Sequence, residues 1–532
     1  MRRTKIMRRP ILIALLVVIA LLAASCGDGD TDTTAAGTDD TTAAGTDTTA
    51  ATETTVAGAA DDGVLNVVRF ESFAGWDLDG AAGYADYQSH FQVMEGLLRF
   101  NPDGKGVEAG LAEDWVWDPD AFTWTFTLRE DATFSNGDPV TWEDVAFSLT
   151  VWQEGANFGE SYGSIASITG EGKTVVMELY DTDITLLPFL SASVSGVMPK
   201  DYAGMTRDEF LLNPIGAGPY MVEEWSVGGQ IVLTANPHFY DPARPYFKKV
   251  VVDTVPDETE RQILFEGGNA DIVEYLSPTI APQYDPAAVY EAELHSVEHI
   301  GLNVLRPPFD DPLARQAVAY ALDYDAIVAA LDPYFSLPSG ILAPNIQNWA
   351  PPTKPYYRQD LDMAKDLLAQ STVPDGAAVE FIYDVGNDLD TLIGQIVQAN
   401  LAEIGFDVTL TGLETGAFLD RAFSIDADIT VWNYGAVSPD ISDPISWVAV
   451  TGWLFSGQET DTLWGDFFAY AASSTPEEAQ AVIAKIQDGA IDDAAAIAVA
   501  EGVYLTGVNP ALTGFASAPW GLHYYDTIAP GS

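Results

Sequence analysis

Two short patterns along the chain carry side chains that could do catalytic or metal chemistry. The first, GESYG at 159–163, fits the pattern G-x-S-x-G, in which Ser161 would be a nucleophile. Such a serine works on a sharp turn with a strand before it and a helix after it. The preceding stretch VAFSLTVW has the apolar spacing of a helix instead. We therefore keep a secreted serine hydrolase only as an alternative and predict that the chain is not an enzyme.

The second pattern is the pair His295 and His299, four residues apart. On a strand that rises about 3.3 Å per residue, the two rings would lie about 13 Å apart, too far for one metal ion. On a helix, the HExxH arrangement of zinc enzymes is missing because Glu298 falls too late. NPDGKG resembles part of a calcium loop, but Lys105 and Ala112 occupy ligand positions. We expect surface histidines, a hairpin turn, and neither metal nor cofactor.

The only cysteine, Cys26, lies between an apolar run and a polar stretch. Residues 1–25 have a basic start, an apolar run shorter than the roughly 20 residues of a spanning helix, and small residues at the end. This is the pattern of a secretion signal peptide. AASC at 23–26 resembles the lipobox of bacterial lipoproteins, in which the cysteine sulfur carries a lipid. Residues 26–62 are mainly Asp, Thr, Ala and Gly, which predicts a lipidated Cys26 followed by a disordered tether.

The net charge of −56 disfavours nucleic acid as a partner. Binding to phosphates needs a basic stripe, whereas this chain has 79 acidic and 23 basic residues. A single cysteine allows no intramolecular disulfide and no cysteine-based zinc site. Stability must therefore come from hydrophobic burial. With 47% hydrophobic residues and 13 Trp, the long segment after the tether can bury a large core and is expected to form more than one lobe.

Strand patterns recur through the rest of the chain. FTWTFTLR at 122–129 alternates apolar and polar residues, as a half-buried strand does. Further strands are predicted at 64–70, 173–180, 229–236 and 248–255.

Helix signals stand beside these strands. Thr141, with Asp144 three residues later, resembles a capping box, and Asp311 followed by proline is a good N-cap. The helical pattern at 387–405 ends on a glycine and is followed by the strand-like FDVTL, and a further helix is predicted at 88–100. Together the patterns predict an α/β fold assembled from several pieces.

One long segment resembles the sequence pattern of a known protein family. LAEDWVWDPDAFTWTFTLREDATFSNGDPVTWEDVAFSLT at 111–150 closely resembles the pattern LAxxW, TYTFxLR and FxDGxPxTAxDVxxS of the family 5 extracellular solute-binding proteins. These proteins serve ABC importers for oligopeptides, dipeptides and nickel complexes. MEGLLRFNPDG at 94–104, NPIGAGPY at 213–220 and GLNVLRPPFDDPLARQAVAYALDYDAIV at 301–328 match further family segments in family order. The resemblance covers about residues 64–530.

The resemblance implies a two-lobed, periplasmic-binding-protein-like α/β fold of type II, of the large class with an extra inserted domain. A solute would be enclosed between the lobes, and closure about a hinge would hold it there. Following the family pattern, the expected divisions are a lobe I of 64–86 with 212–275 and 506–532, an inserted domain of 87–211, and a lobe II of 276–505.

The resemblance also indicates ligand-binding residues. In peptide-binding members, an Asp in a DxxDP segment pairs with the α-ammonium group of the ligand, and DISDP at 440–444 puts Asp440 at that position. The family usually has a Trp about three residues before that Asp, whereas Trp432 comes eight before it. Trp432 and Tyr434 would share one strand face and form an aromatic wall for apolar side chains, with core packing as the alternative.

Lobe I offers a second set of candidates in ESFAGWDLDG at 71–80, where family members contribute backbone to the ligand. Phe73 and Trp76 could face the ligand from this irregular loop. No basic residue stands out as a partner for a ligand carboxylate, although Arg69 in the first strand is possible.

The predicted function is that of an extracytoplasmic substrate-binding lipoprotein of an ABC importer. It would capture a small-molecule solute, a peptide in the first instance, and deliver it to permease subunits. We expect a monomer attached to the outer face of the cell membrane through Cys26. The alternative within the class is a non-peptide solute such as an oligosaccharide, an opine or a metal chelate.

Overall fold

The computed structural model describes the chain from residue 63 to residue 531 with gaps at 81–82, 102–105, 345, 435–437, 439, 451–455, 458–460 and 519–520. All described residues belong to one compact unit, Val56–Ser532. The predicted signal peptide, the tether and Cys26 lie outside the described residues.

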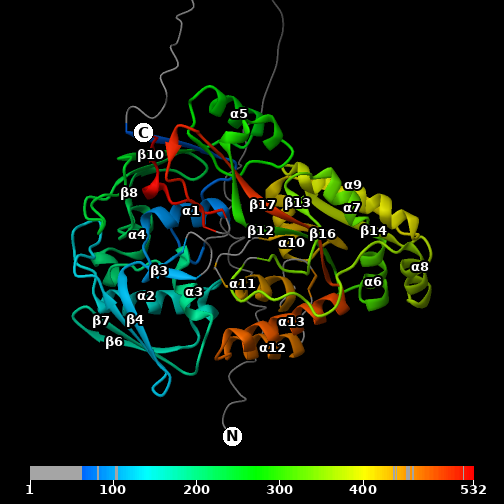
Figure 1. The fold of residues 1–532 in the computed structure, drawn as a ribbon, viewed down its shortest axis with the longest axis horizontal. Coiled ribbons are helices and arrows are strands. Elements are labelled where there is room, and N and C mark those ends of the chain that lie inside the picture. Colours follow the sequence, from blue (N-terminus) through cyan, green and yellow to red (C-terminus); the bar gives the residue numbers. More distant parts are fainter. Residues whose placement is uncertain are drawn as a thin grey trace, which may run out of the picture. The chain divides into compact units, whose positions relative to one another are not determined.

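A large mixed sheet organises this compact unit (Figure 1). Its strand order is β15-β14-β16-β12-β17-β11-β1-β10-β9-β8, with β13 pairing to β17. The bounds are β1 Val64–Arg69, β8 Tyr220–Trp225, β9 Ile231–Ala235, β10 Lys249–Thr254, β11 Ile272–Val273, β12 Val289–Leu302, β13 Phe335–Ser336, β14 Ala378–Asp384, β15 Asp407–Leu413, β16 Ile429–Tyr434 and β17 Ala496–Val508.

Two long antiparallel strands, β12 and β17, join the halves of this sheet. Near its start β12 pairs Val289 with Gly507, and near its end Gly301 with Ala496. β17 continues on to β11, whereas β12 pairs on its other side with β16. The register of the β12–β17 pair shifts between Glu298 and His299, where β17 carries one extra residue. Such a bulge twists the strands locally and redirects side chains.

Helices cover the part of the sheet that begins at β12. Their bounds are α6 Pro312–Ala321, α7 Tyr324–Ala330, α8 Leu361–Gln370, α9 Asp388–Glu403, α10 Thr415–Phe423, α11 Ser442–Pro444, α12 Asp461–Ala471 and α13 Pro476–Asp493, with a π-helix at Ile445–Val450. Most of these helices pack with β12, β14, β16 and β17 around one hydrophobic core whose buried members run from Val297 to Ala500.

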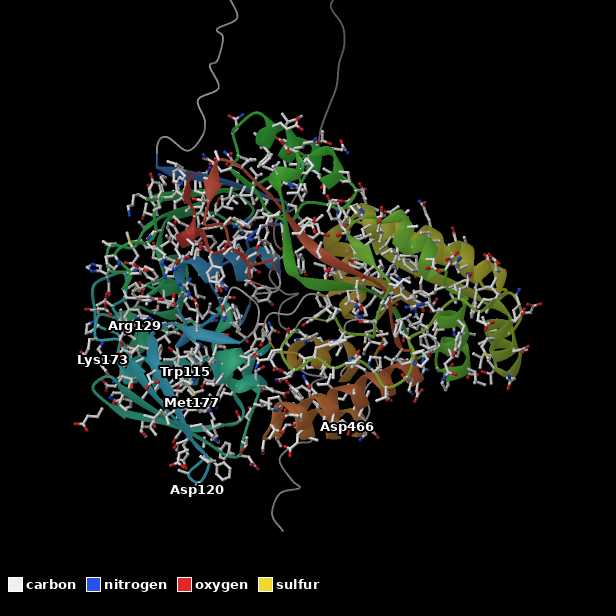
Figure 2. The ribbon with its side chains drawn as sticks, in the orientation of Figure 1. Trp115, Asp120, Arg129, Lys173, Met177 and Asp466 are labelled. Atoms are coloured by element: carbon white, nitrogen blue, oxygen red, sulfur yellow. The ribbon has the colours of Figure 1, made fainter. Side chains whose placement is uncertain are left out.

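The N-terminal part contains a second, smaller sheet with the order β4-β5-β7-β6. Figure 2 labels Trp115 and Met177, which lie on two of its strands. Its strands are β4 Ala112–Asp118, β5 Thr123–Leu128, β6 Ile165–Glu171 and β7 Thr174–Leu179. The other elements here are the β2 Leu98–Phe100 and β3 Val107–Ala109 pair, and helices α1 Tyr84–Val93, α2 Trp142–Glu154, α3 Leu186–Leu190, α4 Arg207–Leu212 and α5 Glu258–Glu266.

Two further cores belong to these N-terminal elements. One gathers buried residues from the small sheet, α2 and the segment up to Ala217, and the other gathers residues of β1, β8, β9 and β10. Both receive residues from the C-terminal segment, including Tyr524 in the first and Tyr525 in the second. The expected lobe and domain bounds remain predictions.

Most predicted elements are present. The capping box at α2 is confirmed, because Asp144 Oδ2 accepts hydrogen bonds from the backbone N–H and the hydroxyl of Thr141 at 2.8 and 2.7 Å. The N-cap at α6 is also confirmed, since Asp311 Oδ1 accepts from the backbone N–H of Leu313 at 3.0 Å.

The predicted helix at 88–100 is wrong in its second half. α1 ends at Val93, Met94 is extended at φ −93° and ψ 145°, and Leu98–Phe100 forms β2. A Cβ at Gly96 would lie 2.8 Å from the carbonyl oxygen of Leu190, so close backbone packing holds this glycine out of the helix. Tertiary packing here overrides the helical spacing of the apolar residues.

Candidate functional site

Asp440 is fully buried at the start of α11 and already has a complete set of protein partners. Its Oδ1 accepts from the backbone N–H of Ser442 at 2.9 Å, and its Oδ2 accepts from Asn348 Nδ2 at 2.8 Å. The hydroxyl of Tyr470 lies 2.6 and 2.7 Å from the two carboxylate oxygens. Burial raises the pKa of Asp440, while the hydrogen bonds from Tyr470 and Ser442 oppose that rise. Asp440 thus ties the start of α11 to α12 and to the loop at 348. Its role toward an ammonium group stays a prediction.

Asp443, three residues further on, lies close enough to the N-terminal part of the chain for its charge to act on Tyr87 there. The hydroxyl of Tyr434 donates to Asp443 Oδ2 at 3.3 Å. The charge on Asp443 is also the largest electrostatic contribution, after burial, to the raised pKa of Tyr87 in α1. The DxxDP segment therefore comes close to α1 through its second acid.

Trp432 and Tyr434 are two residues apart on β16 and have different surroundings. Trp432 stacks on Phe418 with a centroid distance of 5.7 Å and an interplanar angle of 18°, and it meets Phe423 edge-on at 5.9 Å. These contacts are those expected if Trp432 packs in a hydrophobic core. Tyr434 is half-buried, and burial followed by the charge on Asp443 raises its pKa well above the usual value. Of the two predicted wall residues, Tyr434 has the more polar surroundings.

Phe73 and Trp76 lie in the hydrophobic core around β1, β8, β9 and β10. The two rings meet edge-on at 4.8 Å, and Trp225 packs 5.5 Å from Phe73 and 6.4 Å from Trp76. Their exposed fractions are 0% and 1%. The irregular loop thus carries large aromatics because it closes this core, and ligand contact by either ring remains a prediction.

Arg69 is engaged in an internal ion pair and is buried. Its Nε lies 3.1 Å from Glu274 Oε2, and its Nη1 donates to the carbonyl oxygen of Ala85 and to Ser89 Oγ. A hydroxyl of Tyr525 donates to the other oxygen of Glu274. Since these partners use the guanidinium, Arg69 anchors β1 to α1.

Five tyrosines from α1, β16, β17 and the segment after β11 lie within reach of one another's charges. This tyrosine cluster is Tyr84, Tyr87, Tyr275, Tyr434 and Tyr504. Burial raises the pKa of each phenol, and the charges of neighbouring members add to the rise for Tyr84, Tyr275 and Tyr434. All five nevertheless remain half-buried rather than buried. Phenol rings of this kind offer an apolar face together with a hydroxyl for polar contact.

Tyr275 in this cluster has an unusual backbone. Its φ of +55° is in the left-handed region, which a bulky residue rarely adopts. Tyr275 lies two residues after the end of β11, and the centroid of its ring is 5.0 Å from that of Phe70. A conformation of this kind costs of order 1–3 kcal/mol and is concentrated at functional sites.

Beside this cluster lies a buried acid that sequence analysis did not select. Glu298 on β12 is directly opposite Asn433 on β16, and the Asn433 amide donates to Glu298 Oε1. The hydroxyl of Tyr504 donates to Asn433 Oδ1 at 3.3 Å. Burial raises the pKa of Glu298 to about 7, and the Asn433 hydrogen bond opposes that rise. The one sequence signal that could have singled out Glu298 is that this acid lies within an apolar strand pattern.

The two patterns with reactive residues have structural explanations. Ser161 lies in a 3-10 turn, Gly159–Tyr162, that follows α2 and precedes β6, so the strand–turn–helix context of a nucleophile is missing. His299 is buried, contrary to the expected surface position, and its Nε2 lies 2.8 Å from the carbonyl oxygen of Ile341. The side chain of His295 lies outside the described residues. Within the described part of the chain, no group of three or more His, Cys, Asp or Glu is placed to hold a metal.

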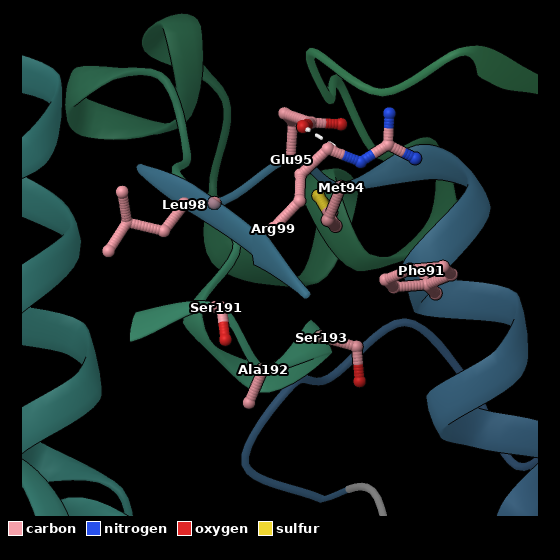
Figure 3. A pocket seen from close by; sticks show the side chains of 9 residues that line it. Phe91, Met94, Glu95, Leu98, Arg99, Ser191, Ala192 and Ser193 are labelled. Carbon is pink, nitrogen blue, oxygen red and sulfur yellow. Dashed lines mark ion pairs between the residues drawn. The ribbon is translucent and has the colours of Figure 1, made fainter. Parts of the chain in front are cut away.

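A small pocket of about 10 Å³ lies near the C-terminal end of α1 (Figure 3). Arg99 Nε is 3.6 Å from Glu95 Oε1, and Arg99 also pairs with Asp526 at 3.4 Å. Burial raises the pKa of Glu95 to about 7. The pocket is lined by Phe91, Met94, Glu95, Gly96, Leu98, Arg99, Ser191, Ala192 and Ser193. Because its charged groups pair with one another, we assign it a structural role.

Solved structures of binding proteins share this fold. The periplasmic binding protein DppA from Helicobacter pylori in complex with the peptide STSA matches with a TM-score of 0.78 and 21% identity, over 88% of this chain and 98% of that chain. The binding protein AgaA from A.tumefacien R10 in complex with agropinic acid matches with a TM-score of 0.77 and 22% identity, over 88% and 99%. The fold is therefore the two-lobed, type II periplasmic-binding-protein fold, as predicted.

Sequence relatives agree with this fold. The probable D,D-dipeptide-binding periplasmic protein DdpA of Escherichia coli (strain K12) is 27% identical over 385 residues, which are 68% of this chain and 71% of that protein. Fold and relatives together define a substrate-binding protein of ABC transporters.

The family follows from a direct match. The model described as bacterial extracellular solute-binding proteins, family 5 Middle, matches residues 106–453, more than half of the chain. The chain belongs to this family, whose members are transport proteins rather than enzymes. Among the described residues, no helix has the length and apolar character that crossing a membrane requires.

Proposed function

We propose that this chain captures a peptide-like solute outside the cytoplasm and delivers it to the permease of an ABC importer. The observation that carries the proposal is the approach of α1, from the N-terminal part of the chain, to acids and phenols of α11, β16 and β17. Asp443 raises the pKa of Tyr87 in α1, and Tyr504 on β17 contributes to the raised pKa of both Tyr84 and Tyr434. A ligand between these elements would contact both lobes at once.

The charge of these groups favours an amine over an acid as the ligand's recognition group. Asp443 offers a carboxylate, whereas Arg69 is already paired with Glu274. A carboxylate that meets an ammonium group compensates the cost of drawing that group out of water. Peptides carry an α-ammonium group, and the two relatives named for peptides or dipeptides give independent support.

The division into lobes belongs to this proposal. Lobe I would be 64–86 with 212–275 and 506–532, the inserted domain 87–211, and lobe II 276–505. Closure would then bend the chain where it passes between lobes, including the start of β12 and the end of β17. The protein would act as a monomer, attached to the outer face of the membrane by a lipid on Cys26.

Native mass spectrometry of the chain without residues 1–26 tests the ligand class directly. We expect a co-purified peptide or, after its removal, a rise in melting temperature with di- and tripeptides. N-acetylated peptides are the matched control because they lack only the α-ammonium charge. A rise with opines or sugars but with no peptide would contradict the peptide assignment and favour the non-peptide alternative.

A further inference from the structure

Glu298 is a fully buried acid whose hydrogen bonds are incomplete. Its exposed fraction is 0%, and among the described atoms its Oε2 has no hydrogen-bond partner. Oε1 accepts from Asn433 on the neighbouring strand. A buried carboxylate oxygen with no partner costs about 1–3 kcal/mol or more, so its presence requires an explanation.

The position of Glu298 is specified by strand pairing. It lies between Asn433 on β16 and Ala500 on β17, and the register of the β12–β17 pair shifts directly after it. Bulges are found next to binding sites because they redirect a side chain. Glu298 is therefore held by two neighbouring strands.

Among the residues that the structure describes, the groups that face Glu298 supply no positive charge. The charge of Glu298 raises the pKa of Asp390 on α9, Tyr504 on β17 and Tyr275 after β11. Burial and Asn433 account for the pKa of Glu298 itself, with no cation among the contributions. This contrasts with Glu274, which is equally buried and pairs with Arg69 at 3.1 Å.

Asp440 gives a second contrast. Both of its oxygens accept hydrogen bonds from Tyr470, Asn348 and Ser442, so a ligand would have to displace a protein partner there. At Glu298 Oε2, by contrast, a ligand would displace no described hydrogen-bond partner. The Asn433 side chain lies between Glu298 and Tyr504 and is hydrogen-bonded to both. Tyr504 is half-buried, so only Asn433 separates the Glu298 carboxylate from a residue with accessible surface.

We propose that Glu298 Oε2 receives a positively charged side chain of the ligand, which makes basic peptides, those with a Lys or Arg residue, the preferred solutes. This inference rests on the proposed function and names the substrate class of the same site. The basic side chain would supply the positive charge that no described neighbour of Glu298 provides. An amine at this place gains a charge-assisted hydrogen bond in a site shielded from water, where such bonds are strongest.

The first test uses the wild-type protein without its signal and tether, and two probe pairs. These are Ala-Lys and Ala-Lys-Ala, each compared with the same peptide acetylated on the lysine Nε. We expect the free lysine form to bind at least about tenfold more tightly in each pair that binds, because one buried charge pair is lost on acetylation. Equal affinity within the pairs overturns the inference.

The second test is Glu298→Gln, which keeps the shape of the side chain and its acceptor for Asn433. We expect this variant to bind the acetylated peptides as the wild type does and to lose the preference for free lysine. The matched control is Glu291→Gln, an exposed acid on the same strand, which should keep the full preference. A preference retained in Glu298→Gln overturns the inference and leaves a bound water as the partner of Oε2.

Proton release gives a readout that a purely structural role would not change. Ion pairing keeps Glu298 ionised, so lysine-peptide binding near pH 7 should release protons, detected by calorimetry in buffers of different ionisation enthalpy. Glu298→Gln should lose this release. If the wild type binds lysine peptides without releasing protons, the inference is wrong but the proposed function is unaffected. If wild type binds no peptide at all, the proposed peptide function falls and takes the inference with it.

Discussion

Replacing Glu298 by Gln should change how the stability of the ligand-free protein depends on pH. Burial raises the pKa of Glu298 to about 7 in the folded chain, whereas an exposed glutamate titrates near 4.5. The folded state therefore holds this proton at pH values where the unfolded state has lost it. For an acid whose pKa rises on folding, stability falls as pH increases through that window and levels off above it.

The size of the effect follows from the two pKa values. A change from about 4.5 to about 7 corresponds to about 3 kcal/mol, since one pH unit is worth 1.36 kcal/mol. Glu71 and Glu95 also have a pKa raised to about 7, and Asp390 has a raised pKa, so the wild-type slope contains their contributions too. Only the difference between wild type and Glu298→Gln isolates Glu298.

Urea unfolding at several pH values between about 4.5 and about 8 measures this difference. We expect the variant to gain about 3 kcal/mol relative to wild type across that range, with most of the change below pH 7. Glu291→Gln, on the same strand but exposed, should run parallel to wild type. A constant difference between wild type and Glu298→Gln would refute the claim that this acid is buried without a counter-charge.

Three further substitutions test the other assignments. Asp440→Ala should lower the free energy of unfolding by about 3 kcal/mol in urea, because the Tyr470 hydroxyl loses its buried acceptor; unchanged stability would contradict that packing. Arg69→Met should lower the free energy of unfolding by about 3–5 kcal/mol, because it leaves Glu274 buried without a counter-charge. Adding Glu274→Gln should recover part of this loss. If the losses of the two substitutions simply add, the ion pair does not contribute to stability. Cys26→Ser should move the protein from the membrane to the soluble fraction on cell fractionation, and retention at the membrane would argue against lipidation.

Local sequence signals predicted many of the elements correctly. The Thr141–Asp144 capping box and the Asp311 N-cap depend on residues within three positions of each other, and both are present. The alternation at 122–129 also became β5, with Phe126 and Leu128 buried. These signals succeed because the hydrogen bonds and the strand period involve neighbours in the chain.

The candidate site was predicted less well, because its residues are joined over long separations. Asn433 and Glu298 are 135 residues apart, and Asn348 and Asp440 are 92 apart. No local pattern distinguishes Glu298, whose oxygen lacks a partner, from an acid that has all its partners.

The sequence by itself determined the family, the α/β class, the acidity and most local starts and ends of elements, because these depend on composition and on neighbours in the chain. Only the tertiary structure decided that Phe73 and Trp76 close a core, that Asp440 is fully hydrogen-bonded and that Glu298 is buried with no cation among its described neighbours. The physical reason is that burial and charge compensation belong to the packed assembly of β12, β16 and β17 with their helices. The groups that surround a side chain in the folded protein determine the free-energy cost of burying it and whether it can bind a ligand.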